Sequence, residues 1–202
     1  MVRFFEDTNI KAIADAIRAK TGSTDTYKTS EMASAILAIQ AGGDATADYL
    51  VSNRSGLTSY NFPSGVTKIE QYAFTGCSKL ALTALPETIT SIGQNAFASC
   101  TALAISKLPE GLSEVSTSAF SMCKGITTMT LPASIMYVWT SAFSFCTNLT
   151  QVTFKGTPEE IADNAFNYCS NLTVINVPWA KDAVAGAPWG ATKATINYNH
   201  AG

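Results

Sequence analysis

The sequence is poor in charged residues and in histidine. Only 14% of its 202 residues are charged, and 13 basic residues stand against 15 acidic ones. A surface that follows a phosphate backbone needs an excess of basic side chains, so no nucleic-acid partner is expected. The single histidine, His200, lies two residues from the C-terminus. Chain ends rarely hold a Ser-His-Asp arrangement rigidly, so no catalytic residue and no enzymatic activity are expected.

Long apolar runs and phosphate-binding glycine loops are also missing. No stretch approaches the roughly 18–20 apolar residues of a membrane-spanning helix, so no membrane insertion is expected. The opening MVRFFEDTNI lacks the apolar core of a secretory signal peptide, which predicts folding in the cytoplasm. The glycines of AGGD, residues 41–44, are followed by neither the lysine nor the helix of a nucleotide-binding loop. No cofactor is therefore expected.

What the sequence does contain is a repeat of 23 residues. Five Ala-Phe pairs and five cysteines recur with this step: Phe74, Phe97, Phe120, Phe143 and Phe166, and Cys77, Cys100, Cys123, Cys146 and Cys169. Further apolar columns follow the same step through Ile69, Leu80 and Leu85. A period in the low twenties is typical of a solenoid whose coils each carry a strand and shorter segments. We expect about five coils, with the Phe column filling the interior.

The five cysteines could bind a metal, form disulfides or pack as small apolar side chains. Zinc ligands converge tetrahedrally, whereas cysteines at one position of stacked coils form a straight row. Neighbouring Cβ vectors would run parallel, which is unfavourable for a disulfide, and five is an odd number. We therefore predict buried free thiols and no metal site.

The two ends of the chain do not follow the repeat. Residues 1–43 are predicted to form two short amphipathic helices and a linker, which together make a docking or oligomerisation module. Its candidate docking residues are Ile10, Ile13, Ile17, Met32, Ile36 and Ile39. The solenoid is assigned to residues 44–178, with residues 44–62 as a degenerate N-terminal cap. Residues 179–202 are assigned as a C-terminal cap segment containing Trp179 and Trp189.

One strand of each coil should present polar side chains outward. The candidate binding positions on this face are Lys107, Thr128, Thr130, Gln151, Thr153 and Asn176. Such a face can meet sugar hydroxyls, or it can simply be hydrated. In the earlier coils Thr83 and Ser106 stand where Met129 is apolar, so we expect those coils to pack less tightly.

Aromatic residues break the repeat in the fourth and fifth coils. Tyr137 and Trp139 flank Val138, and strand alternation points both of them outward. Phe145 and Tyr168 share one column of exposed turn positions. An exposed aromatic patch of this kind can be a protein interface, can bind a glycan, or can be covered by the C-terminal segment.

The unit LPxxITSIGxxAFxxCxxL, from Phe62 to Val177, resembles the BspA-like, treponemal-type leucine-rich repeats. This resemblance implies an α+β repeat fold: a leucine-rich-repeat solenoid of about five 23-residue coils, preceded here by the short helical hairpin. The N-terminal segment DTNIKAIADAIRAKTGSTDTYKTSEMASAILAI resembles a module of tail-associated proteins of phages and prophages of Gram-positive bacteria. The closing segment VPWAKDAVAGAPWGATKATINYN resembles the end of the same proteins.

These resemblances imply a non-catalytic virion protein, assembled in the bacterial cytoplasm and located on the phage tail. Its solenoid would act as a binding arm in host-surface recognition or tail assembly. The implied partners are other tail proteins, further copies of the chain, and a glycan or protein of the bacterial surface. The alternative function is that of a bacterial cell-surface adhesin of the BspA type.

Overall fold

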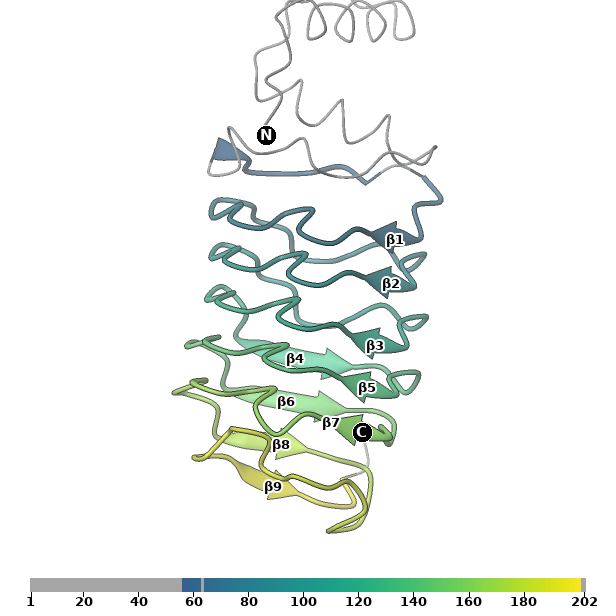
Figure 1. Ribbon diagram of the computed structural model, residues 1–202, viewed down its shortest axis with the longest axis vertical. Helices are drawn as coiled ribbons and strands as arrows, with labels where there is room; N and C mark the ends of the chain where they lie inside the picture. Colours follow the sequence, from purple (N-terminus) through teal and green to yellow (C-terminus); the bar gives the residue numbers. More distant parts are fainter. Residues whose placement is uncertain (1–55, 63, 201–202) are drawn as a thin grey trace, which may run out of the picture.

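The protein is a parallel β-solenoid whose coils stack along the long axis of the molecule (Figure 1). The computed structural model describes residues 56–62 and 64–200. The prediction of a leucine-rich-repeat solenoid with 23-residue coils is confirmed, and the described residues contain no α-helix. The predicted helical hairpin, with Ile10, Ile13, Ile17, Met32, Ile36 and Ile39, lies outside the described residues.

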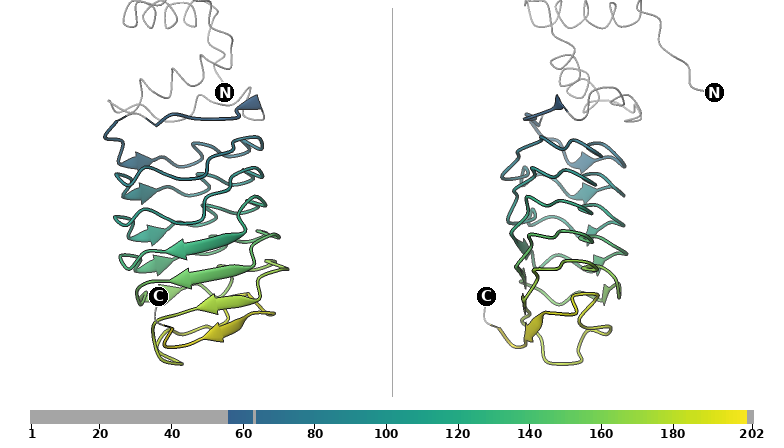
Figure 2. Two further views of the ribbon diagram at one scale, coloured as in Figure 1. Left: turned by 180° about the vertical axis from the view of Figure 1, so that it is seen from behind. Right: turned by 90° about the vertical axis from the view of Figure 1, so that its left-hand side faces the viewer.

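Two sets of strands run along opposite sides of the stack (Figure 2). The first set consists of two-residue strands: β1 (Lys68–Ile69), β2 (Ser91–Ile92), β3 (Glu114–Val115), β5 (Tyr137–Val138) and β7 (Glu160–Ile161). The second consists of β4 (Thr128–Leu131), β6 (Gln151–Phe154), β8 (Val174–Asn176) and β9 (Thr195–Asn197). All pairs are parallel, in the sheets β1-β2, β3-β5-β7 and β4-β6-β8-β9. Each coil therefore places equivalent residues beside each other.

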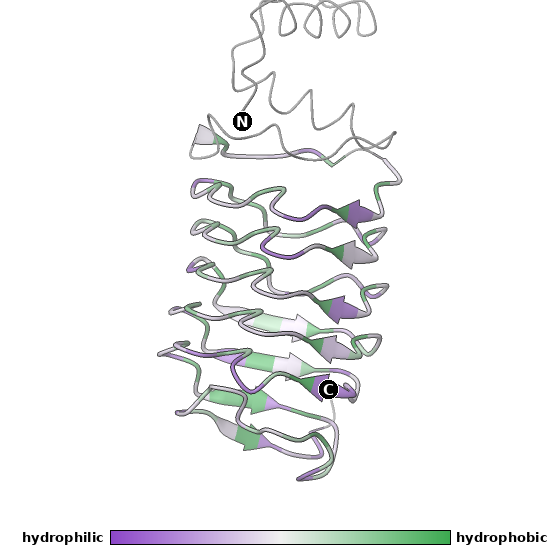
Figure 3. Cartoon of the chain, viewed as in Figure 1, coloured by the Kyte–Doolittle hydropathy of each residue, from purple (hydrophilic) through white to green (hydrophobic). Residues whose placement is uncertain are grey.

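Alternation of polar and apolar residues explains which side of each strand is buried. In β1, β3 and β7 a hydrophilic residue precedes a hydrophobic one (Figure 3). The second residue of each short strand is a β-branched Ile or Val with at most 3% of its surface exposed. Side chains of this type fit the pleated, half-buried surface of a strand.

The Phe and Cys columns of the repeat both lie in the interior, together with the other apolar columns. The rings of Phe74, Phe97, Phe120, Phe143 and Phe166 stack with successive centroid distances of 5.1, 5.5, 5.4 and 5.5 Å. All five cysteines are free and buried, which confirms the prediction of buried free thiols. The Sγ–H groups also donate hydrogen bonds: Cys100 to the carbonyl of Phe74 at 3.0 Å and Cys123 to that of Phe97 at 3.1 Å. Both carbonyls also accept a backbone N–H, from Cys77 and Cys100 respectively, so each thiol is a second donor to a carbonyl with two lone pairs.

Aromatic side chains pack at both ends of the solenoid interior. Tyr60 and Phe62 pack edge-on against Phe74, with centroid distances of 5.0 and 5.9 Å. At the other end Trp179 and Trp189 pack near Phe154, at 5.2 and 6.4 Å. Trp189 lies 23 residues after Phe166 and is fully buried. Our sequence reasoning missed this spacing. The Trp189 carbonyl accepts from the Phe166 N–H at 3.0 Å, a place that the Ala before each Phe takes in the earlier coils, so the register is shifted by one residue at this end.

The expectation of looser packing in the earlier coils is wrong for the coil that contains Ser106. Ile105, one position earlier, turns inward and is only 1% exposed, while Ser106 is exposed. The preceding coil behaves differently, because Leu82 is only half-buried. This local change of register leaves Lys107 joined to Thr130 by one isolated bridge, so the four-residue strands begin only at β4.

Candidate binding surface

Three bulky side chains form an exposed column on successive turns, which we call the aromatic ridge (Met122, Phe145 and Tyr168). Their exposed fractions are 43%, 43% and 61%. The rings of Phe145 and Tyr168 stack at a centroid distance of 4.4 Å with an interplanar angle of 20°. The two aromatic residues predicted for this column are therefore in contact and accessible together.

The backbone of the aromatic ridge is in the left-handed region. Phe145 and Tyr168 both have φ of 59°, and Met122 has φ of 62°. Gly76 occupies the same turn position in an earlier coil, with φ of 75°. A side chain in this conformation costs roughly 1–2 kcal/mol, a penalty that glycine avoids. Bulky apolar residues here oppose both backbone preference and hydration, which is more typical of a binding surface than of a structural turn.

The C-terminal tryptophans do not cover the aromatic ridge. Trp179 and Trp189 are 5% and 0% exposed, and their rings pack against each other and near Phe154 at the end of the stack. The structure therefore gives no support to the alternative in which these two tryptophans cover the aromatic patch.

The other predicted aromatic pair lies at β5, with Tyr137 in the strand and Trp139 directly after it. Tyr137 and Trp139 are half-buried, and their rings stack on each other at 5.2 Å and 9°. Each ring donates its polar hydrogen to a carboxylate of a neighbouring coil. Trp139 Nε1–H binds Glu114 Oε2 at 2.8 Å, and the Tyr137 hydroxyl binds Glu159. This hydrogen bond to Glu159 raises the pKa of Tyr137, so the hydroxyl stays protonated as a donor. Sequence reasoning had identified the rings but not these carboxylates.

A shallow hollow of about 590 Å³ lies beside this pair, next to the residue that follows Trp139. Its lining comprises Thr140, Glu159, Glu160, Ile161, Ala162, Asp163, Asn164 and Ala185. Three of these residues carry carboxylates and none is basic. The hollow is therefore a region of negative potential beside an aromatic surface.

The predicted polar face is brought together by the sheet β4-β6-β8-β9. Lys107, Thr130, Thr153 and Asn176 occupy one column, and Thr128 and Gln151 pair in another. One prediction needs correction, because Asn176 is only 6% exposed. Its amide donates to Thr153 Oγ1 at 3.3 Å and its Oδ1 accepts from Asn197 at 2.8 Å. Strand β9 adds a further rung to the sheet, so this amide serves as an internal link between coils.

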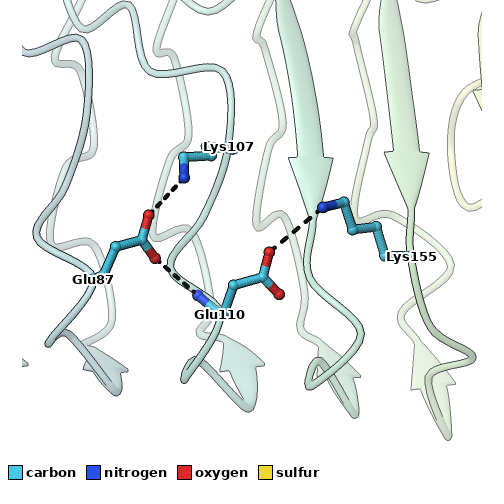
Figure 4. Close-up of polar contacts among 4 residues, drawn as sticks. All are labelled: Glu87, Lys107, Glu110 and Lys155. Atoms are coloured by element: carbon cyan, nitrogen blue, oxygen red, sulfur yellow. Dashed lines mark hydrogen bonds and ion pairs between the residues drawn. The ribbon is translucent and has the colours of Figure 1, made fainter.

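Lys107 is likewise engaged with its own chain. Its Nζ lies 2.6 Å from Glu87 Oε1, while Lys155 Nζ lies 3.5 Å from Glu110 Oε1 (Figure 4). Glu87 Oε2 also accepts a hydrogen bond from the Glu110 backbone at 3.3 Å. The hydrogen bond from Lys107 is the main cause of the lowered pKa of Glu87. The Lys107–Glu87 pair joins successive coils, whereas Lys155 and Glu110 are 45 residues apart and their pair spans two coil steps on a well-hydrated surface.

The described part of the chain lacks two further kinds of feature, a metal site and a membrane span. Within residues 56–62 and 64–200, no group of three or more His, Cys, Asp and Glu side chains is placed to hold a metal ion. Over the same ranges there is also no helix with the length and hydropathy needed to span a membrane.

Comparison with known proteins identifies the repeat. The profile of the BspA-type leucine-rich repeat region matches residues 45–173 in six copies. No curated protein matches the chain significantly. Among solved structures, a leucine-rich repeat protein of T. pallidum is 27% identical with a TM-score of 0.58, and the match covers 71% of this chain and 70% of that protein.

Two further solved structures share the repeat over part of their length. A leucine-rich repeat protein from Bacteroides ovatus is 24% identical with a TM-score of 0.44, covering 55% of this chain and 35% of that protein. A leucine-rich cell surface protein from Faecalibacterium prausnitzii is 23% identical with a TM-score of 0.35, covering 72% of this chain and 54% of that protein. The chain spans less than two thirds of either protein.

Proposed function

Because the chain belongs to the BspA-type leucine-rich repeat family, we propose that it is a non-catalytic recognition module of a bacterial surface adhesin. The observation that carries the proposal is the aromatic ridge, whose stacked Phe145 and Tyr168 rings are exposed on a stiff repeat scaffold. Its partner would be a protein or glycan that buries these rings.

Physical chemistry favours the aromatic ridge as the contact that supplies affinity. Aromatic side chains bury about 150–250 Å² each and dominate the energetics of many interfaces. Stacking between Phe145 and Tyr168 restricts both rings before a partner arrives, which lowers the entropy lost on binding. Stacking of the core phenylalanines likewise restricts the relative motion of the coils that carry these two rings.

The role on a phage tail was expected from the N-terminal segment, which lies outside the described residues, and from the closing segment. No phage protein is among the matched proteins above. The adhesin role is therefore the function proposed here. Self-association, contacts with tail proteins and location on a virion stay predictions.

Cell binding tests this function. The purified chain would be labelled and its binding to intact bacterial and epithelial cells measured by flow cytometry, for the natural sequence and for Phe145→Ser/Tyr168→Ser. Loss of two central aromatic contacts should weaken binding about thirtyfold or more. Tyr72→Ser is the matched control, because Tyr72 is also an aromatic residue with positive φ and is 46% exposed.

Two results would contradict the proposal. One is the absence of saturable binding to either kind of cell. The other is a folded double variant that binds as tightly as the natural protein. Zymography on bacterial cell walls tests the expectation that the chain has no wall-degrading activity, and we expect no clearing.

A further inference from the structure

The outward face of the sheet β3-β5-β7 carries an aromatic pair between acidic residues. We call it the acidic–aromatic face (Glu114, Tyr137, Trp139, Glu159 and Glu160). It shares no residue with the aromatic ridge. Parallel pairing places Glu114, Tyr137 and Glu160 side by side in one row across the sheet. A carboxylate-bearing rung therefore lies on each side of the aromatic rung.

The hydrogen bonds of the two rings determine which part of each ring faces the carboxylates. Trp139 donates to Glu114 and Tyr137 donates to Glu159, so the positive edges of both rings face carboxylates. Because the rings stack on each other, the outer face of each ring is the face left for a ligand, and a ring face attracts cations. The stack between the rings further restricts their orientation.

The acidic residues of this region are not neutralised within the described chain. The ion pairs of the described residues are Lys68–Glu70, Lys107–Glu87 and Lys155–Glu110. None of them involves Glu114, Glu159, Glu160 or Asp163. The last three of these acidic residues line the hollow of about 590 Å³ beside Trp139.

We propose that the acidic–aromatic face binds a cationic side chain, Lys or Arg, in an exposed segment of a partner protein. The ring faces of Tyr137 and Trp139 would contact the cation and its aliphatic stem, and the carboxylates lining the hollow would supply the counter-charge. A neutral sugar could stack on the same rings but would leave the clustered negative charge without compensation. Charge complementarity therefore selects the basic peptide.

Fluorescence anisotropy with the full chain tests this proposal. The probe is a labelled peptide in which arginines alternate with Gly-Ser spacers, and a peptide with glutamate in place of arginine is the negative probe. We expect saturable binding of the arginine peptide alone, with affinity falling steeply between 50 and 300 mM salt, roughly the range over which screening shortens from about 14 to 6 Å.

Matched variants locate the site. Glu159→Gln/Glu160→Gln and Trp139→Ala should each weaken binding about tenfold or more. Trp139→Phe retains a ring face and should lose much less, which separates cation binding from a general effect on folding. Glu87→Gln/Glu110→Gln removes the same charge from another surface and should leave binding unchanged.

Several outcomes would overturn the proposal. They are equal loss in the Glu87/Glu110 control, full binding by the Glu159/Glu160 variant, and competition by a neutral oligosaccharide without binding of the peptide. The aromatic ridge variant Phe145→Ser/Tyr168→Ser should still bind the arginine peptide. Failure of this site and failure of the proposed adhesin function are therefore distinguishable.

Discussion

The first and last coils of the solenoid share one interior but have different surfaces. Phe97 in an early coil and Phe143 in a late coil are both fully buried between neighbouring phenylalanines. On the surface, the turn position held by Gly76 and Ser99 becomes Phe145 and Tyr168. Stacking therefore constrains the interior of every coil alike, while exposed positions are free to differ from coil to coil.

The same contrast holds on the short strands. The outward positions of β2 and the residue after it are Ser91 and Gly93, whereas those of β5 are Tyr137 and Trp139. Both proposed binding surfaces therefore depend on the later coils.

The largest expected effect is the loss of stability on removing a core phenylalanine, and it tests whether early and late coils are packed equally well. Phe97→Ala and Phe143→Ala should each destabilise the protein by about 3–5 kcal/mol, because each removes a ring stacked between two others. Chemical unfolding followed by circular dichroism measures both. Phe145→Ala is the surface control and should change stability by about 1 kcal/mol or less. Costs for the two core variants that differed severalfold would contradict a uniform core.

The next effect concerns pH and the cysteine column. Burial raises the pKa of Cys123 from 9.0 to about 12. Because the pKa is raised in the folded state, the contribution of this thiol to stability is complete below pH 9 and is lost as pH rises toward 12. The loss is on the order of 4 kcal/mol. We expect the unfolding free energy of the natural protein to fall more steeply over this range than that of Cys123→Ala. Parallel pH profiles would show that the interior at this coil is hydrated.

A third prediction concerns the position directly after the short strand, which is Gly93 in an early coil and Trp139 in a later one. A Cβ at Gly93 would lie 2.5 Å from the backbone nitrogen of Gln71. Gly93→Ala should therefore destabilise the protein by about 1–3 kcal/mol, as the coils must separate slightly. Thermal unfolding of Gly93→Ala and of Gly76→Ala distinguishes this clash from the φ penalty, since a Cβ at Gly76 meets nothing within 4 Å.

A fourth prediction concerns the hydrogen bonds that link the Asn176 amide to Thr153 and Asn197 in neighbouring coils. Asn176→Ala should cost about 1–2 kcal/mol, because Thr153 and Asn197 lose their partner in a partly buried site. Thr130→Ala, on the same column but half-buried, should stay within about 0.5 kcal/mol. Equal effects in urea unfolding would mean that these hydrogen bonds contribute nothing.

The smallest effect is expected for the ion pairs between coils. Lys107 and Lys155 pair with carboxylates through side chains that are 58% and 50% exposed. Exposed pairs are screened by salt and solvent, so Lys107→Met and Lys155→Met should leave the unfolding midpoint unchanged at physiological ionic strength. A clear shift of the midpoint would show that these contacts hold the coils together.

Sequence reasoning predicted the regular parts of the structure well, because a periodic core must repeat its side chains at the coil length. The inward Phe column, the buried free cysteines and the strands β6 and β8 followed from the 23-residue step. Trp189 also follows Phe166 by one 23-residue step, so its burial could have been predicted. The different composition of the segment around it obscured this spacing.

The irregular parts could not be predicted in the same way. In its coil Ile105 points inward instead of Ser106, because a one-residue shift of register buries more apolar surface than the regular register would. Asn176 is buried because the last coil adds a strand that the repeat did not indicate.

By itself, the sequence determined the solenoid, its 23-residue step and which residues face its interior, because those properties depend on the spacing of apolar side chains along one chain. Only the tertiary structure decided which exposed residues meet. Glu114 and Glu159 reach Trp139 and Tyr137 from neighbouring coils, across separations of 25 and 22 residues. Such contacts depend on coil register and side-chain rotamers, so the site on β5 exists only in the stacked molecule.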